Sequence, residues 1–271
     1  MTGQLISDSN FRRRVITAVI GMPLVIAVVV LGYPVWTVVV ILVGLVCVRE
    51  LWKMICPTNQ IALIGMIAVL LSCFLSYAWS NYLFLGLAAA LVWAAELVQM
   101  MGAGDGDVRT FRRGVVYPVL GALYVGIPLS LMLAIRGLDQ GLAWTAMFFA
   151  TNWSTDSFAL IGGRLAGRTK LAPQISPGKT REGAAIGFIL GSAIGFLVSL
   201  VVGLPGVPSL VGSVAVAFLT IIGDLLESWI KRVFSVKDSG SLLPGHGGFL
   251  DRVDGMLLAV PALFIILHTI T

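Results

Sequence analysis

The residues best suited to chemistry lie in the segment from 223 to 254, GDLLESWIKRVFSVKDSGSLLPGHGGFLDRVD. Asp224 and Glu227 are three residues apart, so they share one face if this part of the chain is helical. Asp251 and Asp254 repeat that spacing at the end of the segment. Several carboxylate oxygens beside a polar loop suit hard divalent cations, with positions left for water and phosphate. We therefore predict a Mg²⁺ site formed by Asp224, Asp251 and Asp254.

Cations and glycines lie between these acidic residues. Cationic side chains can neutralise charge on a transferring phosphoryl group, and glycines let backbone amides approach phosphate closely. His246, in the Gly-rich part, could bind phosphate or move a proton; a loop histidine that only hydrogen-bonds the backbone is the alternative. We predict catalytic roles for Asp224, Asp251, Lys231, Arg232 and His246, and substrate binding by Lys237, Asp238, Gly247, Gly248 and Arg252. The competing interpretation is that the acids only cap helices or pair with Lys231, Arg232 and Arg252.

A second polar group lies earlier in the chain. Asp156 falls inside an apolar stretch, where an ionisable side chain is costly and indicates a functional site. It is followed by the polar segment SPGKTREG, whose Ser and Lys are candidate phosphate ligands although the spacing of a P-loop is absent. We predict that Asp156, Ser176 and Lys179 bind substrate and form the wall that faces Asp224. Glu96, alone in another apolar stretch, is interpreted as structural.

Membrane-spanning helices must position these residues. The chain has 271 residues, 58% of them hydrophobic and only 11% charged, and its mean hydropathy is +0.98. Soluble domains carry about 25% charged residues. Charges, Pro and Gly divide the apolar stretches into spans of about 20 residues, the length that crosses a bilayer as a helix.

The resulting fold prediction is an all-α, polytopic integral membrane protein. It has about nine transmembrane helices, at 15–32, 35–52, 61–79, 82–101, 115–135, 143–163, 184–203, 208–226 and 255–271. Residues 1–271 are predicted to form a single helical membrane domain, with the catalytic part mainly in 150–260.

The distribution of positive charge predicts the orientation. With a cytoplasmic N-terminus, 17 of the 18 Lys and Arg residues lie on the cytoplasmic side and only Arg136 lies on the other, as the positive-inside rule requires. This bias explains the net charge of +5 without a nucleic-acid partner. The three cysteines lack the CxxC spacing of a zinc site and are interpreted as packing residues. We predict a multi-pass protein of the bacterial cell inner membrane, with its active site facing the cytoplasm.

The segment 228–254 resembles the signature of the phosphatidate cytidylyltransferase (CDP-diacylglycerol synthase) family. It contains Ser228, then Lys-Arg, Lys-Asp, a Pro-x-His-Gly-Gly element, and Asp-Arg-x-Asp ending at Asp254. Asp156 with Ser157, and Ser-Pro-x-Lys-Thr-x-Glu-Gly from Ser176, are also similar to elements of this family. The resemblance is strong over the C-terminal half and rests on hydropathy alone in the N-terminal half.

The resemblance implies a reaction, cofactors and an assembly. The chain would condense CTP with phosphatidate, giving CDP-diacylglycerol and pyrophosphate in phospholipid biosynthesis. The reaction would depend on Mg²⁺ and on a second cation such as K⁺. The enzyme would be a homodimer surrounded by membrane lipids.

Two other functions stay open. A CTP-dependent membrane lipid kinase would transfer the γ-phosphoryl group and release CDP in place of pyrophosphate. An ion-coupled transporter would use intramembrane acids. The acids of this chain concentrate near one membrane face and in loops, whereas a transporter needs them at the midplane.

Overall fold

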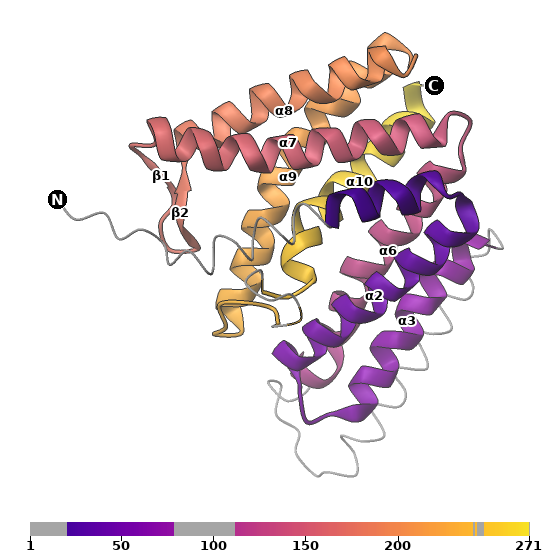
Figure 1. The fold of residues 1–271 in the computed structure, drawn as a ribbon. Helices are drawn as coiled ribbons and strands as arrows, with labels where there is room; N and C mark the ends of the chain where they lie inside the picture. The colour runs from indigo at the N-terminus through magenta and orange to yellow at the C-terminus, as the bar shows by residue number, and fades with distance from the viewer. Residues whose placement is uncertain (1–20, 79–111, 241, 243–246, 271) are drawn as a thin grey trace.

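Long α-helices make up most of the protein (Figure 1). The structure, a computed structural model, describes residues 21–78, 112–240, 242 and 247–270. In chain order the elements are α2 (Tyr33–Ile55), α3 (Gln60–Ala78), the π-helical turn η1 (Arg112–Val116), α6 (Tyr117–Gly137), α7 (Gly141–Ala166), the strands β1 (Lys170–Ala172) and β2 (Ser176–Thr180), α8 (Arg181–Val201), α9 (Gly206–Val233) and α10 (Leu250–Ile270). A shorter apolar helix covers Gly21–Val30.

Six helices of the described chain are long and apolar enough to cross a membrane: α2, α3, η1 with α6, α8, α9 and α10. They confirm an α-helical protein with several membrane-capable helices. Helix α7 covers the predicted span 143–163 and has 26 residues, a length of about 39 Å, but it is not apolar enough to join the six. The predicted span 82–101 and part of 15–32 lie outside the described residues, so the count of nine stays a prediction.

Helices α9 and α10 extend past the limits that hydropathy predicts. Their spans were expected to end at 226 and to begin at 255, whereas α9 continues to Val233 and α10 begins at Leu250. A hydropathy window stops at the first charges, but charged side chains at a helix end can reach the polar membrane boundary without breaking the helix. Asp224 and Lys231 therefore both lie within α9, and Asp251 lies in the first turn of α10.

A glycine turn separates the first short helix from α2. Gly32 precedes α2 with φ of 111°, a left-handed conformation that favours glycine, and Pro34 lies in the first turn. The break that Gly32, Tyr33 and Pro34 predict between the first two spans is confirmed.

Small residues bring α7 and α8 unusually close together. Gly191 and Gly195 of α8 are buried, and a β-carbon on either would overlap a threonine of α7, Thr155 or Thr151 respectively. Removing side chains from a helix face lets two backbones approach within a membrane. The tight contact fixes the part of α7 that carries Asp156.

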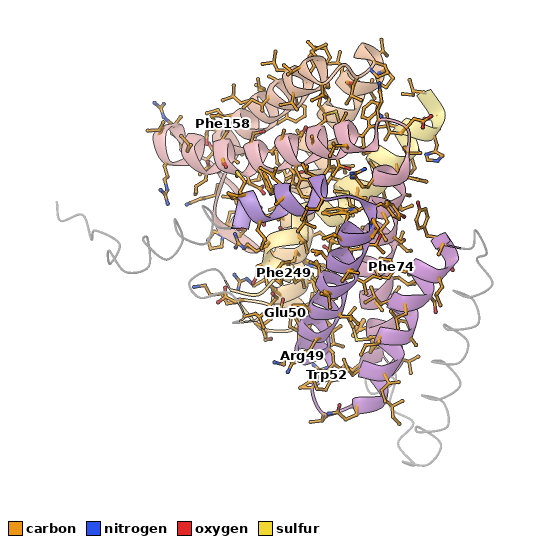
Figure 2. All side chains as sticks on the ribbon, turned by 45° about the vertical axis from the view of Figure 1, so that its right-hand side comes forward. Arg49, Glu50, Trp52, Phe74, Phe158 and Phe249 are labelled. Atoms are coloured by element: carbon orange, nitrogen blue, oxygen red, sulfur yellow. The ribbon has the colours of Figure 1, made fainter. Side chains whose placement is uncertain are left out.

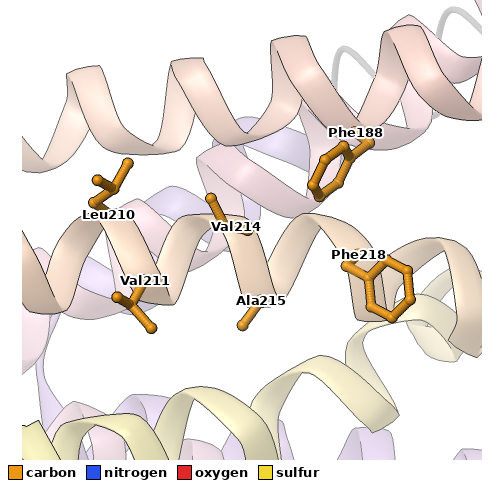
Figure 3. Close-up of a pocket in the computed structure, with 6 residues that line it drawn as sticks. All are labelled: Phe188, Leu210, Val211, Val214, Ala215 and Phe218. Atoms are coloured by element: carbon orange, nitrogen blue, oxygen red, sulfur yellow. The ribbon is translucent and has the colours of Figure 1, made fainter.

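Helix α10 joins two groups of helices (Figure 1). Helices α2, α3 and α6 pack together, and α7, α8 and α9 form a second group, while α10 contacts α9, α6 and α2. A fully apolar groove of about 500 Å³ lies between α8 and α9 (Figure 3), lined by Phe188, Leu210, Val211, Val214, Ala215 and Phe218. An apolar outer surface is expected of helices that face lipid.

Candidate active site

A buried group of charged side chains joins the end of α9 to the start of α10. Lys231 Nζ lies 2.5 Å from Glu227 Oε2 and 2.6 Å from Asp251 Oδ1. Glu227 is one turn before Lys231 on α9, and its side chain is only 1% exposed. A lysine between two carboxylates satisfies charges that would be costly to bury alone. The sequence left open that an acid pairs with Lys231 instead of binding a metal. In the structure, Asp251 forms this pair.

Asp251 also organises the segment that precedes α10. Its Oδ2 accepts hydrogen bonds from Gly248 N at 2.8 Å, Ser239 Oγ at 3.0 Å and Ser239 N at 3.1 Å. Gly247 has φ of 81°, and a β-carbon there would lie 2.6 Å from the same oxygen. Both carboxylate oxygens of Asp251 are thus engaged by protein groups. The glycines permit close approach to a carboxylate, and their predicted contact with phosphate stays a prediction.

Asp156, Asp224 and Asp254 lie near one another on three different helices. Asn152 Oδ1 of α7 accepts a hydrogen bond of 2.9 Å from Thr220 Oγ1 of α9. Asp156 and Asp224 each follow one turn later, so they lie along the same interface. Asp254 of α10 is repelled electrostatically by both. The three helices therefore present a negative region at one end of the protein.

The donor chemistry of this region suits a hard cation, but a closed metal site is not formed. Within residues 21–78, 112–240, 242 and 247–270, no three His, Cys, Asp or Glu side chains converge closely enough to hold a metal ion. Asp224 is 31% exposed and pairs with Lys179. The carboxylates of Asp156, Asp224 and Asp254 supply the oxygen ligands that Mg²⁺ prefers. Asp251 fits that set less well because its oxygens are already used.

A small antiparallel hairpin covers this region from the side of α8. Strands β1 and β2 pair Lys170 with Thr180 and Ala172 with Ser176. Ser176 and Lys179, expected in a phosphate-binding loop, lie instead on strand β2. On this strand Lys179 forms an ion pair with Asp224, across the interface between β2 and α9.

Hydrogen bonds of three side chains fix the hairpin in place. Thr180 Oγ1 accepts from Gly183 N at 3.2 Å and so caps α8. Glu182 accepts from the backbone amides of Arg168 and Thr169 at 3.0 and 3.1 Å. Arg232 Nε donates to Ile175 O at 3.3 Å, which ties the hairpin to α9.

The remaining predicted residues are distributed around these two groups. Arg252 is exposed and is attracted electrostatically to Asp156. Lys237 and Asp238 are exposed in the connection between α9 and α10. His246 lies outside the described residues. The structure thus brings Asp156, Lys179, Asp224 and Asp254 together in one group, and Lys231, Asp251 and Gly248 in the other.

Glu50 is a polar residue of this region that sequence reasoning did not select. It is 5% exposed on α2 and accepts hydrogen bonds from Ser239, Phe249 and Leu250. One signal was available: Glu50 is the one acidic residue of α2 and lies near the end of a long apolar stretch. Its partners are about two hundred positions later in the chain, so spacing alone could not reveal them.

Comparison with known proteins assigns a family. The model of the cytidylyltransferase family matches residues 12–270. The phosphatidate cytidylyltransferase of Brucella abortus biovar 1 (strain 9-941) is 35% identical over 265 residues, which cover 95% of this chain and 93% of the relative. That of Bacillus subtilis (strain 168) is 33% identical over 267 residues, covering 95% and 98%. That of Rickettsia typhi (strain ATCC VR-144 / Wilmington) is 37% identical over 159 residues, covering 55% and 68%. The chain therefore belongs to the cytidylyltransferase family.

Proposed function

We propose that the protein is a phosphatidate cytidylyltransferase, which condenses CTP with phosphatidate to give CDP-diacylglycerol and pyrophosphate. Two relatives that this chain matches over nearly their whole length carry that name. The structural observation that supports the proposal best is the group of acids from α7, α9 and α10 beside Lys179. These groups lie toward one end of the helix bundle, next to the β1–β2 hairpin, where a soluble nucleotide and a lipid headgroup can meet.

The reaction needs positioning and charge neutralisation more than a protein nucleophile. A phosphate oxygen of phosphatidate attacks the α-phosphorus of CTP, and the bond from that phosphorus to the β-phosphate oxygen breaks. The electron pair leaves with pyrophosphate. Because the attacking group is already an anion, the protein must mainly align the two substrates and neutralise charge on the phosphates.

The cationic residues of the site are suited to that task. Lys179 pairs with Asp224, and Arg252 is exposed and attracted electrostatically to Asp156, so both cations could turn to a phosphate oxygen. Arg232 anchors the hairpin that carries Lys179. Lys231 is held between two buried carboxylates and supports the arrangement of α9 and α10.

We propose that Asp156, Asp224 and Asp254 hold Mg²⁺ together with the triphosphate. Bound Mg²⁺ would neutralise phosphate charge and orient the triphosphate for in-line attack. Asp251, also expected as a metal ligand, is better suited to holding Ser239 and Gly248 beside Lys231. A second cation such as K⁺ is proposed without residues assigned to it.

We further propose that the site faces the cytoplasm from the inner membrane. Its end of the protein carries Lys53, Lys179 and Lys231 at the ends of α2, β2 and α9, whereas Arg136 lies at the opposite end, where it donates to Val29 O at 3.1 Å. This asymmetry is that of the positive-inside rule. CTP is a cytoplasmic substrate, which agrees with the same orientation. A homodimer is proposed from the family resemblance alone.

One assay tests the activity and separates it from its nearest rival. Purified protein is incubated with radiolabelled CTP and phosphatidate, with and without a chelator, and the lipid extract is scored for bound cytidine. We expect a lipid-linked cytidine product and release of pyrophosphate, both lost when divalent cations are chelated. Release of CDP with a phosphorylated lipid would show a kinase, and ion flux without chemical change would show a transporter.

A further inference from the structure

Glu50 is a buried acid that lies outside the groups so far assigned to substrate or metal. It is on α2, in the N-terminal half of the chain, and only 5% of it is exposed. Figure 2 shows it beside Phe249, at the point where α10 begins. Burying a carboxylate is costly unless hydrogen bonds replace its water.

Three donors surround the Glu50 carboxylate. Phe249 N lies 2.9 Å from Oε1, Leu250 N lies 2.8 Å from Oε2, and Ser239 Oγ lies 3.1 Å from Oε2. The two amides belong to the start of α10, where backbone N–H groups have no partner within the helix and the helix dipole favours a negative charge. Glu50 of α2 therefore acts as the N-terminal cap of α10.

Two glycines make room for this contact. A β-carbon at Gly240 would lie 2.7 Å from Glu50 Oε1, and one at Gly248 would lie 2.5 Å from Oε2. A side chain at either position would require the Glu50 carboxylate to move from its hydrogen-bonding partners. Gly240 and Gly248 thus let the backbone approach the Glu50 carboxylate closely at two places.

Ser239 connects Glu50 to the charged group of α9 and α10. Its hydroxyl oxygen lies 3.1 Å from Glu50 Oε2 and 3.0 Å from Asp251 Oδ2, so its one proton is shared between the two carboxylates. Asp251 in turn contacts Lys231, which pairs with Glu227. A continuous line of contacts therefore runs from α2 to the buried charges at the end of α9.

We propose that Glu50 is a positioning residue for cytidylyl transfer. By holding the start of α10 and Ser239 against α2, it fixes the orientation of Asp251 and Lys231, and with them the turn of α10 that carries Asp254. The inference rests on the proposed function, since it assigns Glu50 to the same reaction. Small displacements of positioned groups cost activity steeply, about 100-fold for about 1 Å.

The test compares Glu50→Gln, Glu50→Asp and Ser239→Ala with wild type in the full-length purified protein. Gln keeps the size but replaces one acceptor oxygen with an NH₂ group that faces a donor, whereas Asp keeps the charge on a shorter side chain. Ser239→Ala leaves the cap on α10 and removes the link to Asp251. Asp139→Asn is the matched control, because Asp139 is exposed near the opposite end of the protein.

We expect Glu50→Gln to lower kcat by about 10-fold to 100-fold while the KM for CTP changes by less than about threefold. Glu50→Asp should recover part of the lost kcat, and Ser239→Ala should lower kcat at an unchanged melting temperature. A Glu50→Gln loss confined to KM, or a Ser239→Ala variant with wild-type kcat, overturns the proposal. Should Glu50→Gln fail to fold, the Ser239→Ala result decides alone.

The activity of the wild-type protein distinguishes the proposed function from the proposed role of Glu50. If wild-type protein makes the lipid-linked product and Glu50→Gln has the same kcat, only the positioning role is refuted. Wild-type protein that makes no such product refutes the proposed function, and the role of Glu50 in that reaction with it. Asp139→Asn must retain wild-type activity for the comparison to count as specific to Glu50.

Discussion

Asp224 and Asp251 have the same side chain but different surroundings. Asp224 is 31% exposed and has an ion-pair partner, Lys179, that is itself accessible. Asp251 has an 8% exposed side chain whose oxygens contact Lys231, Ser239 and Gly248. Exposure would let Asp224 exchange Lys179 for the proposed Mg²⁺, whereas both oxygens of Asp251 are already held by protein groups.

Substitution by asparagine should therefore separate the two residues. Asp224→Asn should lower kcat by about 100-fold or more, because a carboxylate ligand of the proposed Mg²⁺ is lost, while the thermal midpoint stays close to wild type. Asp251→Asn should lower both kcat and the thermal midpoint. Parallel activity and thermal unfolding measurements in detergent check this, and an Asp224→Asn enzyme with normal activity would contradict the proposed metal site.

The buried charge of Lys231 gives a prediction on stability. Lys231→Met leaves Glu227 and Asp251 without their shared cation, so the free energy of unfolding should fall by about 3–5 kcal/mol. Lys237→Met, at an exposed position on the same side of the protein, should change it by less than about 0.5 kcal/mol. Denaturant unfolding in micelles compares the two variants, and equal stabilities would argue against a structural role for Lys231.

The pairings of single residues could be predicted from the sequence only where the partners are close along the chain. Lys231 and Asp251 are 20 positions apart, and their pairing was an explicit alternative to a metal role. Glu50 and Leu250 are 200 positions apart. The contact depends on how α2 packs against α10, which no local pattern encodes.

At the scale of elements, hydropathy locates the apolar centre of each helix but not its ends. The predicted spans 35–52 and 184–203 correspond to α2 and α8 within a few residues. The ends of α9 and α10 are predicted wrongly from charge and glycine content, because each helix continues into the polar boundary of the membrane. The segment SPGKT, expected as a loop, pairs with β1 as a strand, since its register depends on a partner strand.

The contact between α7 and α8 can be tested on one helix. Gly191→Val places a side chain against Thr155 and should force the two helices apart, lowering the thermal midpoint and the activity together. Ala193→Val adds the same bulk on the exposed face of α8 and should leave both near wild type. Thermal unfolding of the two variants distinguishes them. Equal midpoints would mean that the glycines are not needed for packing.

At the scale of the whole molecule, the orientation in the membrane can be measured with single cysteines. The native Cys47, Cys56 and Cys73 are buried and should react slowly with a membrane-impermeant thiol reagent. Gln174→Cys lies on the exposed turn of the β1–β2 hairpin, and Asp139→Cys lies on the exposed turn between α6 and α7. These two positions lie at opposite ends of the helices, because α7 runs the length from one turn to the other.

If the active site faces the cytoplasm, Gln174→Cys should be protected in intact cells and labelled in inverted membrane vesicles. Asp139→Cys should show the reverse pattern. The charge asymmetry requires this result, since the end that carries the hairpin holds most of the described Lys and Arg residues while Arg136 lies at the other. Labelling of Gln174→Cys in intact cells would place the site outside, away from its nucleotide, and would refute the orientation even if the purified enzyme made the expected product.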